Sequence, residues 1–373
     1  MSKITHVRLV RLTDCARMIR TVGHTVTVIV RGEPGIGKTG ILRQIAIMNG
    51  DKWRRVGDNF PTDKYRYIYV DCADMQYGDI KAVIPVHQSK SLEEYVNGIL
   101  GMDDPRPKVI MFDEVLKLPK AIKPVVTRTM RERTAGDRPF TPGTIVFGTS
   151  NNAEDNVGDT TQAHEGSRVS FVHMAKPGLG EWIPWAIENG IDPMLIAWAR
   201  MEPSIFDSYT TLSREALNAN AYIYNPWKPQ TTFVTLRTME MASEFISNET
   251  TLGREVMMAG VAGCLGEAAA NSLDTFFDLN KDIVQFDTIK ASPTTAPIPA
   301  NDIVALLTLL RTVRQIKTQE DLSAVVEYMQ RVKSVELQSC FCVTVLKDPN
   351  TDRMASRNEY LKQWRLKNVE YII

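Results

Sequence analysis

Short apolar runs alternate with amphipathic segments along the first half of the chain. The runs are rich in β-branched and aromatic residues and have the length of buried strands; they cover 25–30, 67–70, 108–112, 144–147 and 169–173. Helix-like spacing or a capping residue marks the segments between them, at 13–20, 40–48, 119–133 and from 91 onward. This alternation predicts an α/β fold with a mainly parallel, five-stranded sheet between helices.

The pattern changes after about residue 176 and becomes helical. The predicted helices are 179–200, 212–220, 235–247, 253–277, 300–316, 319–333 and 355–369. We therefore expect three parts. An α/β core occupies 1–177, a helical insert or linker 178–230, and an all-helical lid domain 231–373.

The composition of the chain bears on its ligands and on the compartment in which we expect it. The 373 residues include 44 Lys and Arg against 44 Asp and Glu, so a general attraction to nucleic acid is not favoured. The five cysteines are scattered and odd in number, which fits a reducing compartment better than a disulfide framework. The sequence shows no apolar leader and no run of 18 apolar residues, so we expect a soluble, cytoplasmic protein that does not cross a membrane.

A glycine-rich loop follows the first predicted strand. It fits G-x-x-x-x-G-K-[ST] and consists of Gly32, Glu33, Pro34, Gly35, Ile36, Gly37, Lys38 and Thr39, with Gly40 opening the next helix. In this context the backbone N–H groups and the helix N-terminus cup phosphates. Lys38 reaches the β- and γ-phosphates, and the Thr39 hydroxyl binds Mg²⁺. The loop predicts ATP and Mg²⁺ as ligands.

Two carboxylates and an amide follow two further strands. Asp113 and Glu114 end the apolar run 109–112, at the edge where parallel sheets place their sites. Asp113 is the predicted Mg²⁺ ligand, directly or through water, and Glu114 the general base that polarises the attacking water. After strand 144–147, Asn151 is predicted to orient that water, with Asn152 as the alternative.

The order of these parts resembles that of the AAA+ ATPases. Within that class, the sensor strand 145–151 and the helix before it look like the MoxR-type and dynein-related branch, over about residues 10–175. The resemblance implies a homo-oligomeric, hexameric ring that hydrolyses ATP at subunit interfaces to remodel a protein. It also implies a possible partner with a von Willebrand A domain.

The resemblance assigns two arginines by role. Arg168 stands where the family places an arginine finger donated to the neighbouring subunit, with Arg131 and Arg133 as rivals. A guanidinium suits that task because it stays charged and donates as a fork. Arg237 is similar to the sensor-2 arginine of the lid, although Leu236 precedes it where the family often has proline.

Other segments carry weaker signals. Tyr77 and Lys81 either contact a substrate chain in the pore of a ring or belong to an ordinary connecting loop. The tryptophans of 182–198 are predicted to be packing residues. Two other functions stay open, a nucleic-acid motor or loader and a nucleotide-gated structural ring.

Overall fold

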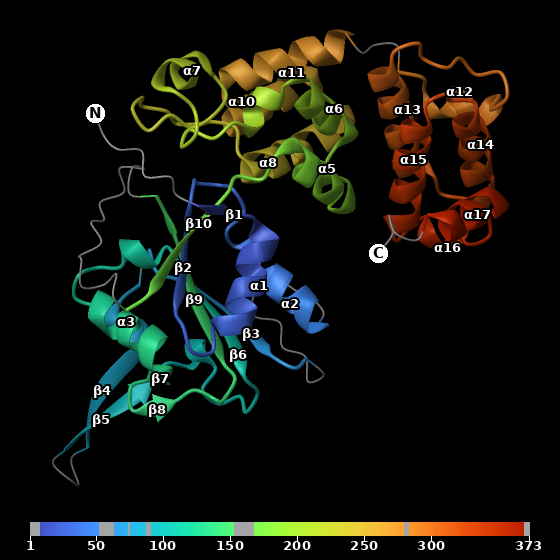
Figure 1. Cartoon of the computed structure of the whole chain (residues 1–373). Helices are drawn as coiled ribbons and strands as arrows, with labels where there is room; N and C mark the ends of the chain where they lie inside the picture. Colours follow the sequence, from blue (N-terminus) through green and yellow to red (C-terminus); the bar gives the residue numbers. More distant parts are fainter. Residues whose placement is uncertain are drawn as a thin grey trace. The chain divides into compact units, whose positions relative to one another are not determined.

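The structure is a computed structural model that describes residues 8–51, 63–73, 75–86, 91–152, 168–279 and 283–368. It divides into two compact units (Figure 1). The first comprises Met1–Pro177 with Pro226–Lys228, and the second comprises Gly178–Asn225 with Pro229–Ile373. We describe each unit by itself.

The first unit is built on a parallel sheet of six strands in the order β1-β10-β2-β9-β6-β3. The strands are β1 (Leu9–Val10), β2 (Val28–Gly32), β3 (Arg66–Asp71), β6 (Lys108–Asp113), β9 (Ile145–Asn151) and β10 (Ser170–Met174). The predicted α/β fold is confirmed. The short strand β1, which pairs with β10, makes the sheet one strand wider than predicted.

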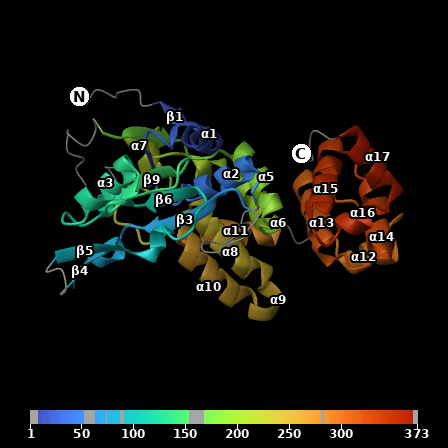
Figure 2. The same cartoon turned by 90° about the horizontal axis from the view of Figure 1, so that it is seen from below.

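Alternating side chains of the strands form two cores, one on each face of the sheet. Val28, Val30 and Phe147 pack with α1 (Leu12–Val22) and α2 (Gly40–Asn49). The intervening positions of the same strands pack with α3 (Lys123–Glu132) on the other face (Figures 1 and 2). The near-continuous apolar runs of the sequence follow from this burial on both faces.

Two antiparallel hairpins interrupt the parallel pattern. One joins β7 (Thr134–Ala135) to β8 (Arg138–Pro139). The other pairs β4 (Lys81–Val86) with β5 (Ser91–Val96) over six residue pairs and runs outward from the main sheet (Figure 1). The helix predicted to start at Ser91 is therefore wrong. A capping signal stabilises a helix by only about 1 kcal/mol, which a continuous ladder outweighs.

The second unit is helical, as predicted. Its α-helices are α5 (Leu179–Glu188), α6 (Pro193–Met201), α7 (Arg214–Ala219), α8 (Leu236–Ser247), α9 (Glu249–Leu252), α10 (Arg254–Leu265), α11 (Glu267–Leu279), α12 (Phe286–Ala291), α13 (Asp302–Gln315), α14 (Gln319–Gln330), α15 (Val335–Lys347), α16 (Asp352–Ala355) and α17 (Glu359–Lys367). Breaks near Gly190 and at Gly266, both with positive φ, divide two of the predicted helices. Helices α9, α12 and α15 were not predicted, and α16 overlaps a predicted helix only at Ala355.

Two hydrophobic cores organise these helices. Trp182 and Trp198 are both 1% exposed in the core that joins α5, α6, α8, α10 and α11, and Trp185 packs against it. The prediction that the tryptophans are packing residues is confirmed. A second core is formed by the helices from α12 through α17 and includes Tyr328 and Phe341. Within the described residues, we find no helix with the length and apolar character that crossing a membrane requires.

Candidate active site

The sheet order brings the three sequence motifs to one edge. Strands β2, β9 and β6 are neighbours and run parallel, so their carboxyl ends meet. Gly32, the first residue of the glycine loop, pairs with Asn151 at the end of β9. Phe112 pairs with Gly148, which places Asp113 and Glu114 beside the same stretch of β9. The loop, the carboxylates and the amide therefore face one another across adjacent strands.

The glycine loop has the backbone that its glycines permit. Gly35 and Gly37 have φ values of 71° and 89°, in the left-handed region that favours glycine. A Cβ atom at Gly37 would meet nothing within 4 Å, so this part of the loop faces open space. Helix α2 begins immediately afterwards at Gly40, and its first N–H groups lie at the end of the loop. This arrangement fits a phosphate group.

Lys38 lies folded against its own loop and is only 8% exposed. Its Nζ donates to the carbonyl oxygens of Gly32 and Glu33 at 3.0 and 2.7 Å, and to Asn151 Oδ1 at 2.8 Å. Three oxygen acceptors compensate for burying the ammonium. Lys38 is thus the link between the glycine loop and the end of β9.

Asp113 is buried at the end of β6 and is held on both carboxylate oxygens. Tyr69 donates its hydroxyl to Oδ2 at 2.9 Å. Thr149 donates its hydroxyl to Oδ1, which also accepts from the N–H of Glu114 at 3.1 Å. The carboxylate therefore has a fixed orientation.

Thr39 and Asp113 offer the donor set that Mg²⁺ prefers, a hydroxyl and a carboxylate oxygen. Thr39 directly precedes α2, but its side chain does not cap that helix, so the hydroxyl is not engaged in the cap. The residues therefore fit a divalent cation bound together with nucleotide phosphates. Their role as ligands stays a prediction.

Glu114 occupies a backbone conformation that is uncommon for a residue with a side chain, with φ 55° and ψ 35°. Such strain costs on the order of 1–3 kcal/mol and gathers at functional sites. Asn151 Nδ2 donates to Oε1 of this carboxylate at 3.3 Å, and Lys117 forms an ion pair with Oε2. Of the two candidate amides, it is Asn151 that contacts both Lys38 and Glu114.

Arg168 lies at the other end of the sheet from the glycine loop. It is exposed and comes two residues before Ser170, the first residue of β10, which pairs with Val28 at the start of the ladder with β2. Gly32 lies four residues after Val28 on β2, so the two residues are about 13 Å apart along the strand. Arg168 is therefore not placed to serve the loop of its own chain.

The two rival arginines have other partners. Arg133 donates to Thr27 Oγ1 at 2.8 Å and to the carbonyl oxygen of Gly23 at 2.7 Å. Its burial lowers the pKa of the guanidinium to about 10. Arg131 forms an ion pair with its neighbour Glu132. Arg133 is thus a structural residue of the first unit, and the finger role of Arg168, with Arg131 as its rival, stays a prediction.

Arg237 belongs to the second unit. It is exposed in the first turn of α8, which Thr235 caps. A cation at this position opposes the helix dipole, so helix stability does not explain Arg237. The sensor-2 role of Arg237 stays a prediction, and so does substrate contact by Tyr77 and Lys81. These two lie in a short 3-10 helix and at the start of β4, and their side chains are outside the described part of the chain.

Three contacts of this site were not predicted, those of Tyr69, Thr149 and Lys117. Tyr69 and Thr149 are found only when the order of strands β3, β6 and β9 is known. Lys117 lies three residues after Glu114 in the 3-10 turn Val115–Lys117, a spacing that could have indicated the ion pair.

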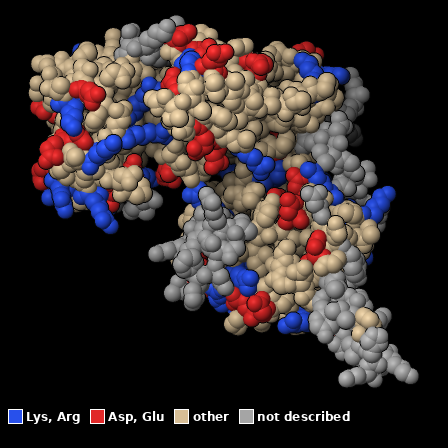
Figure 3. All heavy atoms as spheres, turned by 180° about the vertical axis from the view of Figure 1, so that it is seen from behind, with Lys and Arg blue, Asp and Glu red and all other residues tan. Residues whose placement is uncertain are grey.

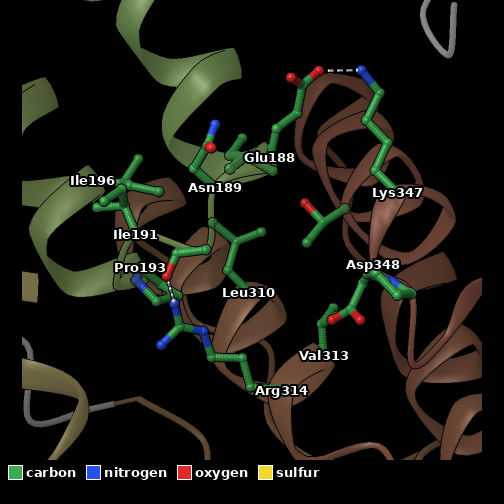
Figure 4. Close-up of a pocket in the computed structure, with 14 residues that line it drawn as sticks. Glu188, Asn189, Ile191, Pro193, Ile196, Leu310, Val313, Arg314, Lys347 and Asp348 are labelled. Atoms are coloured by element: carbon green, nitrogen blue, oxygen red, sulfur yellow. Dashed lines mark hydrogen bonds and ion pairs between the residues drawn. The ribbon is translucent and has the colours of Figure 1, made fainter. Parts of the chain in front are cut away.

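A separate cavity of about 320 Å³ lies in the second unit, between the ends of α5 and α6 and the helices α13 and α15 (Figure 4). Glu188 and Lys347 form an ion pair at one side, and Arg314 donates to the carbonyl oxygen of Gly190 at another. None of the predicted site residues lines this cavity. It is distinct from the candidate active site.

Comparisons with known proteins give weak likenesses only. No protein-family model and no curated protein matches the chain. Two mutants of RuvB from Thermotoga maritima are 12% and 14% identical, with a TM-score of 0.34 each, over 81% and 84% of this chain and 86% and 85% of theirs. A full-length MCM homolog from Methanopyrus kandleri is 12% identical, with a TM-score of 0.30, over 72% of this chain and 54% of its own. Likenesses this weak support no functional assignment.

Proposed function

We propose that this chain is an AAA+ ATPase that hydrolyses ATP with Mg²⁺. The observation that carries the proposal is the chain of contacts from Lys38 through Asn151 to Glu114. It joins three motifs that are 113 and 37 residues apart in the sequence. Each motif taken alone is also compatible with a purely structural role. Hydrolysis needs phosphate binding, water orientation and a general base together.

Each of these residues has its own role in the proposed reaction. The glycine loop and Lys38 hold the phosphates, and Asn151 orients a water for in-line attack on the γ-phosphorus. Glu114 accepts the proton of that water while the bond to the β–γ bridging oxygen breaks, which gives ADP and inorganic phosphate. Mg²⁺, held through Thr39 and Asp113, would neutralise charge on the phosphate oxygens.

We further propose that the site is completed by a second copy of the chain. Arg168 is exposed at the edge of the sheet opposite its own glycine loop, which suits donation to a neighbour. A guanidinium donated in this way stabilises the charge of the transition state and raises the rate by about 10³–10⁵. Hydrolysis then depends on assembly.

The finer assignment rests on the sequence resemblance. We propose a cytoplasmic, hexameric ring of the MoxR type that remodels a protein partner, with a von Willebrand A-domain protein as the first partner to test. Among the side chains coloured in Figure 3, acidic and basic groups are interspersed rather than gathered into one basic stripe. The balance of 44 Lys and Arg against 44 Asp and Glu favours a protein partner over nucleic acid.

The substitution Glu114→Gln tests the proposal. It keeps the shape of the side chain and removes the base, so ATP binding should persist while hydrolysis falls by about 10²–10⁴. Glu132→Gln is the control, because Glu132 is an exposed carboxylate that pairs only with Arg128 and Arg131 among the ion pairs of the described residues. Full turnover by Glu114→Gln would refute the assignment of the base. Partners retained by this variant can then be compared with stimulation by DNA or RNA.

A further inference from the structure

The orientation of Asp113 depends on two hydroxyls that come from different strands. Tyr69 lies on β3 and Thr149 on β9, and these strands flank β6 on its two sides. Tyr69 donates to one carboxylate oxygen at 2.9 Å and Thr149 donates to the other. Thr149 is fully buried and Asp113 is 9% exposed, so water competes little for either contact.

We propose that Tyr69 is a positioning residue that fixes the Asp113 carboxylate for Mg²⁺ bound with nucleotide. This inference rests on the proposed function. The terminal torsion of an aspartate has a broad, two-fold energy profile, so a carboxylate without partners samples many orientations. Each carboxylate oxygen can accept two bonds. Oδ1 accepts from Thr149 and from the N–H of Glu114, whereas among the described residues Oδ2 accepts from Tyr69, so the position for a cation or its water is on Oδ2. Partners of metal ligands commonly act in this way.

The chain offers a matched control on the same strand. Tyr67 lies two residues before Tyr69, so both side chains point to the same face of β3. Its hydroxyl also donates to a carboxylate, Asp51 Oδ2, at 2.6 Å, and accepts from Asn49 Nδ2 at 3.1 Å. Tyr67→Phe therefore removes an equivalent hydroxyl without affecting Asp113.

The experiment measures the affinity for ATP as a function of Mg²⁺ concentration. Mg²⁺ is expected to increase the affinity for ATP up to a maximum. For Tyr69→Phe, we expect the Mg²⁺ concentration that gives half of this increase to rise about tenfold or more. Binding of ATP without Mg²⁺ should stay within about twofold of wild type, because the glycine loop is unchanged. Tyr67→Phe should show the wild-type dependence on Mg²⁺. A loss of packing alone would not move the Mg²⁺ dependence selectively.

Two further outcomes keep the inference testable. If Tyr69→Phe folds poorly, Thr149→Val removes the other hydroxyl at nearly constant volume and should shift the Mg²⁺ dependence in the same direction. The inference is overturned if the variant measured has the same Mg²⁺ dependence as Tyr67→Phe. A wild-type chain whose ATP binding ignores Mg²⁺ would instead refute the proposed function, and the inference with it.

Discussion

Asn151→Ala tests the proposed link between the phosphate-binding Lys38 and the general base Glu114, both of which Asn151 contacts. Lys38 would lose one acceptor but keep the carbonyl oxygens of Gly32 and Glu33, at 3.0 and 2.7 Å. Its ammonium therefore stays compensated, and the affinity for ATP should change by no more than about tenfold. Glu114 would lose the amide that donates to its Oε1.

The expected loss of rate follows from that contact. Removal of an orienting donor costs about 10²–10³ in kcat, or about 2.7–4 kcal/mol. The donor–acceptor distance of 3.3 Å is at the long end for a hydrogen bond, so we expect the lower value, about 10². Phosphate release at saturating ATP measures the effect, with Asn152→Ala as the control. The reasoning is refuted if Asn151→Ala keeps wild-type kcat, or if Asn152→Ala shows the larger loss.

Two further predictions concern stability. The guanidinium of Arg106, which donates to Asp104 at 2.7 Å, lowers the pKa of Asp104 from 3.8 to about 2. A carboxyl with a lowered pKa stabilises the fold above pH 3.8 and loses that effect as the pH falls through 2. Asp104→Asn should therefore cost about 1–2 kcal/mol at pH 7, and the difference should vanish near pH 2 in acid unfolding followed by circular dichroism. Arg314 pairs at 3.2 Å with Asp192, which is 5% exposed, so Arg314→Ala should destabilise the second unit by about 2–3 kcal/mol in calorimetry. Arg311→Ala breaks a longer pair, at 3.8 Å, with Glu249, whose side chain is 33% exposed, and should cost less than about 1 kcal/mol. Equal effects of the two changes would contradict this account.

Local sequence patterns selected residues that the structure brings together, Lys38, Glu114 and Asn151, and their roles stay predictions. Glu114 was identified from its place after an apolar strand, and the structure places it in contact with Asn151. The partners Tyr69 and Thr149 could not be predicted, because their contacts depend on which strands lie beside β6. The contacts of Arg133 with Thr27 and Gly23 likewise depend on packing that the sequence does not show.

Errors in the predicted elements have two physical causes. At Ser91 the capping pattern was a real local signal, but pairing of β5 with β4 overrode it. At α15 the sequence carries a local helix signal. Ser334 caps the helix, and the buried Leu337, Phe341 and Val345 recur at every fourth position. Long-range pairing thus limits prediction at Ser91, whereas α15 follows from the spacing of its own residues.

The central claim, that ATP is hydrolysed at a site shared by two copies, is tested most directly by mixing two inactive variants. Lys38→Ala lacks the lysine that we propose binds phosphate, and Arg168→Ala lacks the guanidinium that we propose is donated to the neighbour. In a random equal mixture, roughly one interface in four joins an intact loop to an intact Arg168. Our account predicts that each variant alone is inactive and that the mixture recovers Mg²⁺-dependent ATP hydrolysis. The account would be contradicted if the mixture does not hydrolyse ATP while the wild type does. Full activity of Arg168→Ala alone would contradict it too.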